Sequence, residues 1–255
     1  GDDTLIIGTS GRYEFKNKGI DVFLESLNRL NRDKDLKKKV LAFVNVPSWV
    51  GDPREDLQKR LKSKDKFTEP LQCPFITHWL HNMTHDQVLD MLKYLGMGNR
   101  PEDKVKVIFV PCYQDGHDGI LNKHYYDLIL GEDLSVYPSY YEPWGYTPLE
   151  SVAFRVPTIT TDLAGFGLWV NSLKNQHGIN DGVEVLHRSD YNYSEVADGI
   201  KDTVALFSTK TEAEIKEIRK RAGQVAEQAL WKHFIQYYYE AYDIALRNAM
   251  KRQLK

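Results

Sequence analysis

Short apolar runs alternate with stretches of helical periodicity along most of the chain. The runs are rich in Val, Ile and Leu and cover residues 4–8, 40–46, 105–110, 134–137, 156–160 and 183–186. Mostly apolar runs of this length indicate strands that are buried on both faces, as in a parallel sheet. Between the first two runs, one buried helical stripe is predicted from the spacing of Ile20, Phe23, Leu24, Leu27 and Leu30.

Further helical patterns cover residues 84–95 and 122–130, and a helical tail is predicted over 211–255. The charge-rich residues 52–66 predict an exposed helix or loop. Strands that alternate with helices in this way predict the α/β class, here a Rossmann-like parallel sheet with flanking helices.

The composition is that of an ordinary globular protein. The chain has 255 residues, 42% of them hydrophobic and 27% charged, and its formal net charge is −2. This balance argues against a strongly basic nucleic-acid-binding protein. No apolar stretch approaches the ~20 residues of a membrane helix, so we expect no membrane partner. The two cysteines, Cys73 and Cys112, exclude a disulfide scaffold and favour a reducing, cytoplasmic compartment.

A basic loop follows the first predicted strand and precedes the first predicted helix. It contains Arg12, Lys16 and Lys18. Cations beside a helix amino end oppose the helix dipole, so they suit a site that recruits an anion such as a phosphate. Three solvated surface charges are the alternative interpretation. Gly8 and Gly11 lack the Gly-x-Gly-x-x-Gly spacing, which argues against a nicotinamide cofactor.

A second candidate segment spans residues 138–150, after a short predicted strand. Its end reads as a helix start, with Thr147 at the N-cap, Pro148 at the first helical position and Glu150 completing a capping box. Glu142 has no such structural explanation, because it lies in a loop rich in Pro, Gly and aromatic residues. A carboxylate in this setting is a candidate for sugar recognition or acid–base chemistry. The unpaired amides near Gly145 offer a second anion site.

Two other patterns have both a structural and a functional interpretation. His78, His81 and His85 have a spacing that suits a metal ion, but surface or packing histidines are favoured over a metal site. An aromatic stripe in the tail fits core packing or a partner-binding helix. The stripe consists of Phe234, Tyr237, Tyr238, Ala241, Tyr242 and Ala245.

Both candidate segments resemble one known family. Residues 138–150, with 156–161 and Gly165-Phe166-Gly167, closely resemble the C-terminal domain of glycogen synthases of the animal and fungal type. Residues 11–15, 17–19 and 21–25 look like the first phosphate loop of the same family. The resemblance covers nearly the whole chain.

The resemblance implies the glycosyltransferase B architecture, in which two Rossmann-like domains face a cleft. Residues 1–255 are similar to the C-terminal, nucleotide-sugar-binding domain alone. The N-terminal acceptor domain is expected to be absent from this chain, which already begins inside a predicted strand. The chain would then be one part of a longer enzyme and inactive on its own.

The resemblance also assigns catalytic roles. By position, Arg12 and Lys18 would hold the distal phosphates of the donor, and Glu142 would lie at the donor glucose. The implied reaction transfers glucose, with retention, from UDP-glucose or ADP-glucose to the 4-hydroxyl of an α-1,4-glucan. The two cations would stabilise the departing diphosphate, so we expect neither a metal ion nor a cofactor.

Donor binding is assigned by the same resemblance. Glu150 would hold the ribose hydroxyls, Tyr125 would stack on the base, and Gly145, Tyr146 and Thr147 would cradle the diphosphate with their amides. Two alternatives stay open at this stage. One is another nucleotide-sugar transferase of the same architecture, and the other is a non-catalytic nucleotide- or sugar-binding module.

Overall fold

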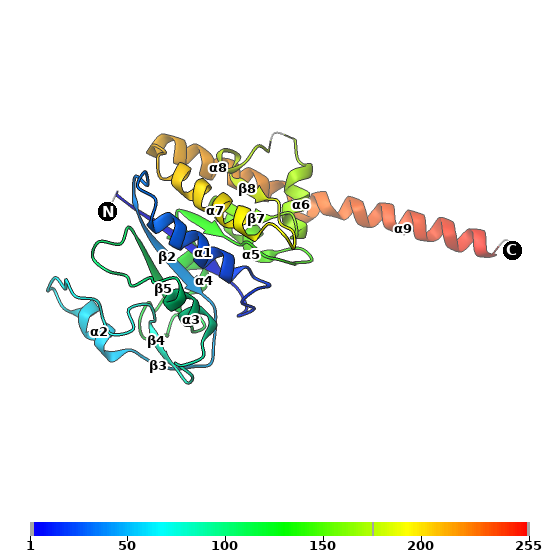
Figure 1. Ribbon diagram of the computed structural model, residues 1–255. Coiled ribbons are helices and arrows are strands. Elements are labelled where there is room, and N and C mark those ends of the chain that lie inside the picture. The colour runs from blue at the N-terminus through cyan, green and yellow to red at the C-terminus, as the bar shows by residue number, and fades with distance from the viewer. Residues whose placement is uncertain (1–2, 175, 254–255) are drawn as a thin grey trace.

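One parallel six-stranded sheet forms the centre of the molecule. The structure is a computed structural model that describes residues 3–174 and 176–253. The strand order is β5-β2-β1-β6-β7-β8, and every neighbouring pair is parallel (Figure 1). The strands are β1 Thr4–Ser10, β2 Lys39–Asn45, β5 Val105–Val110, β6 Leu134–Val136, β7 Thr158–Thr161 and β8 Val183–Leu186. All six predicted strands and the predicted fold class are confirmed.

The strand order reverses between β1 and β6. From β1 the chain continues outward through β2 to β5, and it then returns to place β6 on the other side of β1. In open α/β sheets, ligands bind beyond the carboxyl ends of the strands at such a switch point. The loops that leave Ser10 and Val136 meet there, and they contain the two candidate segments.

Two groups of helices enclose the hydrophobic core. Helices α1 (Ile20–Asn31), α3 (Gln87–Tyr94) and α7 (Tyr193–Phe207) pack with the sheet in the larger cluster, and the predicted stripe of α1 is fully buried. Helices α5 (Tyr146–Ala153), α6 (Gly165–Ser172) and α8 (Glu212–Gln228) form a second cluster. The short helix α4 covers Tyr125–Leu130.

A small antiparallel ribbon lies outside the main sheet. It pairs β3 (Val50–Pro53) with β4 (His78–Leu80), and neither strand was predicted. Between them, helix α2 (Glu55–Lys62) has no buried residue, as expected of an exposed charged segment.

The predicted helical tail consists of α8 and α9, and α9 (Trp231–Gln253) projects away from the body (Figure 1). Residues 254–255 of the predicted tail lie outside the described residues. Phe234 packs against Trp144 and Trp169, with ring centroids 5.4 Å apart in each case. The rest of the stripe, including Tyr237 and Tyr242, is exposed. Core packing therefore accounts only for the first turns of α9. No helix within 3–174 and 176–253 combines the length and apolar character needed to cross a membrane.

Candidate functional site

An ion pair joins the two candidate segments at the switch point. The Lys18 ammonium contacts the Glu142 carboxylate, although the two residues are 124 positions apart in the sequence. Their side chains are only 15% and 19% exposed, respectively. The structure thus brings together two of the three predicted catalytic residues, a cation and a carboxylate, at the carboxyl ends of β1 and β6.

Backbone contacts hold the two loops against each other. The Tyr140 N–H donates to the Asn17 carbonyl at 2.7 Å, and the Arg188 guanidinium donates to the Pro138 carbonyl. Gly19 has a φ of +67°, and a Cβ there would clash with the same Pro138 carbonyl. Only glycine lets the loop before α1 approach this closely. Gly19 therefore determines where the adjacent Lys18 is placed.

Glu142 is anchored through its own main chain. Its N–H donates to the Leu163 carbonyl at 3.3 Å, and its carbonyl accepts from the Gly165 N–H at 3.0 Å. A Cβ on Gly165 would clash with the carbonyl of Pro143. These bonds hold the backbone and leave the Glu142 carboxylate to pair with Lys18.

Arg12 lies on the same loop but outside this ion pair. Its guanidinium is 3.0 Å from Glu14, and its side chain is 76% exposed. The second carboxylate oxygen of Glu14 accepts from Asn17 at 2.6 Å. A phosphate role for Arg12 stays a prediction, and it would need the side chain to turn from Glu14 toward the ligand.

Helix α5 begins earlier than predicted, so the predicted cap is wrong. Gly145, not Thr147, is the N-cap, with a φ of +105° and no side-chain cap hydrogen bond. The left-handed glycine turns the chain sharply, and the helix starts at Tyr146. Pro148 is then the third helical residue, where its missing N–H is tolerated because the amides of a first turn have no intrahelical partner. The amides of Tyr146 and Thr147 belong to this first turn.

Glu150 forms no capping box and faces a tyrosine instead. The Tyr126 hydroxyl donates to a Glu150 carboxylate oxygen at 3.2 Å, and this carboxylate raises the pKa of Tyr126. Glu150 is partly exposed one turn into α5. Its carboxylate therefore keeps acceptor capacity beyond the Tyr126 bond.

A cavity of about 380 Å³ lies beside these loops. It is bordered by the ends of β1 and β2 and by the loop after β5, and its lining includes Ser10, Asn45, Tyr113, Tyr125 and Thr147. The Tyr125 and Ser10 hydroxyls are hydrogen bonded at 2.7 Å, and burial raises the pKa of Tyr125. Two predicted donor-binding residues, Tyr125 and Thr147, thus line one pocket at the switch point. A wider hollow, of about 1120 Å³, lies at the start of β1 beside α8 and contains none of the predicted site residues.

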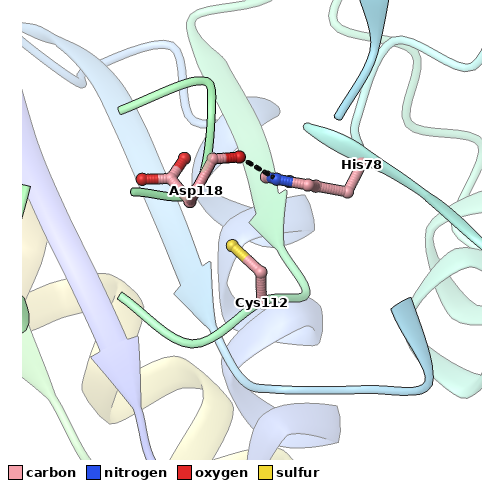
Figure 2. A group of neighbouring side chains, drawn as sticks. All are labelled: His78, Cys112 and Asp118. Carbon is pink, nitrogen blue, oxygen red and sulfur yellow. Dashed lines mark hydrogen bonds between the residues drawn. The ribbon is translucent and has the colours of Figure 1, made fainter. Parts of the chain in front are cut away.

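The three histidines do not come together as a metal site. His81 and His85 are exposed, whereas His78 is buried. His78 instead lies with Cys112 and Asp118, and their nitrogen, sulfur and oxygen ligand atoms are all within 4.8 Å of one another (Figure 2). No local sequence pattern indicates this group, because its members come from β4 and from the loop after β5.

The hydrogen bonds of this second group are structural. His78 donates through Nε2 to the Asp118 carbonyl at 2.7 Å and bonds Thr77 Oγ1 through Nδ1 at 2.9 Å. The Asp118 carboxylate accepts from the backbone N–H groups of the next turn, at 2.9, 2.8 and 2.7 Å. Burial raises the pKa of Cys112 to about 12, so it remains a thiol. Both His78 ring nitrogens and the Asp118 carboxylate already hold the loop together.

Comparison with known proteins gives the family. A family model described as glycogen synthase matches residues 1–54 and 55–255. The chain belongs to the glycogen synthase family. It is 28% identical to the glycogen [starch] synthase of Neurospora crassa, over 97% of this chain and 42% of that protein. It is 29% identical to glycogen [starch] synthase isoform 2 of Saccharomyces cerevisiae, over 100% of this chain and 44% of that protein. The chain therefore spans less than half the length of these relatives.

The fold also occurs in solved structures. The pneumococcal O-GlcNAc transferase GtfA, solved in complex with UDP and GlcNAc, superposes with a TM-score of 0.51 and 13% identity. The match covers 95% of this chain and 36% of GtfA. At this identity the likeness shows the fold alone, a Rossmann-like domain of the glycosyltransferase B type.

Proposed function

We propose that this chain is the donor-binding part of a retaining glycogen synthase. Its reaction transfers glucose from a nucleoside diphosphate glucose to the 4-hydroxyl of an α-1,4-glucan. The observation that supports this best is the Lys18–Glu142 pair at the β1/β6 switch point, next to a pocket lined by Tyr125 and Thr147. A carboxylate for a sugar, a cation for a phosphate and an aromatic ring for a base then lie at one edge of the sheet, and these match the three kinds of group in a nucleotide sugar.

In this proposal the donor lies across the start of α5. The base enters the pocket against Tyr125, and the diphosphate meets the first-turn amides of Tyr146 and Thr147. The Glu150 carboxylate accepts hydrogen bonds from the ribose hydroxyls. Lys18, helped by Arg12, binds the distal phosphate.

The chemical step is electrostatic in character. As the glycosidic bond to the diphosphate breaks, positive charge develops on the sugar ring and negative charge on the leaving oxygen. Glu142 stabilises the first charge and Lys18 the second, in a cleft where both side chains are largely shielded from solvent. Helix amides and side-chain cations hold the diphosphate, so the proposal needs no metal ion.

The acceptor site belongs to a part of the enzyme outside this chain. The relatives are more than twice as long as the matched segment, and a second domain would close the cleft and bind the glucan. The exposed aromatic side chains of α9, among them Tyr237 and Tyr242, supply an apolar surface for that domain. The proposed location is the cytoplasm, without nucleic-acid or membrane partners.

The test uses the full-length protein that contains this chain. It is incubated with UDP-glucose or ADP-glucose and a glycogen primer, and incorporated glucose and the anomeric configuration of the new linkage are measured. We expect α-1,4 extension from one of the donors, lost in Lys18→Ala and kept in Lys16→Ala, because Lys16 is an exposed lysine of the same loop. Transfer to a non-glucan acceptor alone would contradict the glycogen synthase proposal.

A further inference from the structure

A chain of buried hydroxyls ends at a single carboxyl group behind the candidate pocket. The Tyr137 and Ser151 hydroxyls are 2.8 Å apart, and Ser151 Oγ donates to Ser135 Oγ at 3.1 Å. Ser135 Oγ in turn donates to Glu132 Oε2 at 2.6 Å. The chain joins α5, β6 and the turn before β6, and no proposed catalytic step uses it.

The other end of this hydrogen-bonded series of hydroxyls lies beside the pocket. Tyr125 and Ser10, which line the pocket, are hydrogen bonded at 2.7 Å. Strands β1 and β6 pair in parallel with Gly8 opposite Ser135, so Ser10 and Tyr137, two positions further along, follow on the same face of the sheet. In agreement with this placement, Ser10 lowers the pKa of Tyr137 and Tyr137 raises the pKa of Tyr125. Glu132 is therefore hydrogen bonded to Tyr137 through two serine hydroxyls, and Tyr137 lies beside Ser10 of the pocket wall.

In the structure, Glu132 accepts the last hydrogen bond of this series of hydroxyls. A hydroxyl has one hydrogen to donate, and Ser135 gives its hydrogen to Glu132. Ser151 donates to Ser135, so the hydrogen of the Tyr137–Ser151 bond must come from Tyr137. The Tyr137 oxygen is then left with acceptor capacity only. Without an acceptor at position 132, each of these hydroxyls could turn the other way.

The fold accommodates Glu132 at a specific place. Its side chain is buried against Gly8 of β1, where a Cβ would clash with the carboxyl group. Arg219 donates to the backbone carbonyl of Glu132 at 2.7 Å. Two acidic groups lie near Glu132. One is Asp133, and the other is Asp127, which lines the same cavity of about 180 Å³. Burial raises the pKa of Glu132 to about 8, so the carboxyl group is largely neutral at pH 7 and accepts from Ser135 through its carbonyl oxygen.

We propose that Glu132 is a positioning residue for the nucleotide pocket, which holds Ser10 and the ring of Tyr125 in one arrangement through Ser135, Ser151 and Tyr137. The inference rests on the proposed function, because it assumes that Tyr125 receives the base of a nucleoside diphosphate. The arrangement restricts the ring before the nucleotide arrives, and such preorganisation strengthens binding.

The experiment measures binding and turnover in the full-length protein. Uridine diphosphate and adenosine diphosphate are titrated calorimetrically into the wild type, Glu132→Leu and Tyr137→Phe. Each substitution should weaken binding of the preferred nucleotide by about three- to tenfold, the value of one hydrogen bond. The donor KM should rise in proportion while kcat stays unchanged, because neither residue contacts the reacting atoms. Glu132→Gln should keep the wild-type affinity, since its amide carbonyl accepts from Ser135.

A double-mutant cycle separates positioning from general weakening of the fold. If both residues act through one chain, Glu132→Leu with Tyr137→Phe should bind no more weakly than the weaker single variant. Thr158→Val is the matched control, because Thr158 is a buried hydroxyl of the same sheet that donates only to its local backbone. It should leave nucleotide affinity unchanged.

Three results would overturn the proposal. Unchanged affinity in both Glu132→Leu and Tyr137→Phe would assign the chain to folding alone, whatever happens to the melting temperature. Additive losses would show that the two residues act separately. A wild-type protein that binds neither diphosphate would instead overturn the proposed function, and this inference with it. Tyr137→Phe keeps the test open if Glu132→Leu fails to fold.

Discussion

Two groups of polar side chains lie near the carboxyl ends of the strands, and they differ in whether the side chains themselves hold the loops in place. At the switch point, main-chain hydrogen bonds and glycine contacts hold the loops, and the Lys18 and Glu142 side chains pair with each other. In the second group, the side chains of His78 and Asp118 themselves hold the loop after β5. A ligand can recruit the first pair without disturbing the fold, whereas it would have to break the second.

The contrast shows that residue types alone do not define a site. Histidine, cysteine and aspartate within ligand distance make a familiar donor set for a transition metal. Lysine beside glutamate is an unremarkable surface pair in most proteins. What distinguishes the two groups is which atoms the fold has already engaged.

The largest expected effect is on turnover at the switch point. In the full-length enzyme, Glu142→Gln should lower kcat by a factor on the order of 100 or more, because a neutral amide no longer stabilises charge in the transition state. Nucleoside diphosphate binding should barely change, since in the proposed binding mode the carboxylate faces the sugar. Steady-state kinetics and calorimetry measure the two effects. Full activity of the variant would remove Glu142 from the mechanism.

Next in size is the loss of nucleotide affinity on removing a proposed phosphate-binding side chain. Lys18→Ala should weaken diphosphate binding by about 1–3 kcal/mol, the range for a charged hydrogen bond, and Arg12→Ala should act in the same direction. Thermal unfolding should change little in Arg12→Ala because Arg12 is exposed, whereas Lys18→Ala should also lower the melting temperature because it leaves Glu142 without its partner. Lys16→Ala serves as the control for net charge. If Lys18→Ala and Arg12→Ala both bind the diphosphate as tightly as the wild type and Lys16→Ala do, the phosphates bind elsewhere.

Apolar runs were enough to predict the sheet, because buried parallel strands need continuous apolar stretches. The cap at Thr147 was mispredicted because a Thr-Pro-x-Glu pattern fits a capping box, whereas the left-handed Gly145 had already started the helix. The Lys18–Glu142 contact depends on strand order, which local patterns do not contain. The resemblance named both residues, but the contacts of Gly19 and Gly165 explain why they meet.

Replacing Glu132 by glutamine should raise the free energy of unfolding at pH 7, whereas a substitution in the His78 group should lower it. Its folded pKa is raised from 4.5 to about 8, so the folded protein retains a proton that the unfolded chain releases. Its contribution to stability is full below about pH 4.5 and is lost as pH rises to about 8. Glu132→Gln cannot titrate and should be more stable by about 1–3 kcal/mol at pH 7. Denaturant unfolding at pH 5, 7 and 8.5 should show this gap widening with pH. A constant gap would contradict the assignment.

His78→Ala should lower stability and leave the switch point intact. It removes two buried hydrogen bonds, so we expect a loss of about 1–3 kcal/mol in the free energy of unfolding. Nucleotide affinity should stay within about twofold, because His78 does not line the pocket. Adding an equimolar amount of zinc should not change the wild-type melting temperature. A rise that disappears in His78→Ala would make the second group a metal site and would reverse the contrast drawn above.

The smallest expected effect separates the two possible tasks of Glu150. A glutamine there still accepts from Tyr126 through its amide carbonyl, so the melting temperature should not change. If Glu150 also holds the ribose, the weaker neutral acceptor should reduce nucleoside diphosphate affinity by about 0.5–1.5 kcal/mol. The ribose contact is then tested with a 2′-deoxy nucleoside diphosphate. The wild type should lose more affinity than Glu150→Gln on removal of the hydroxyl, because only the wild type offers that hydroxyl a charged partner. Equal losses in the two proteins would show that Glu150 serves Tyr126 alone, and it would then belong with the structural residues of the His78 group.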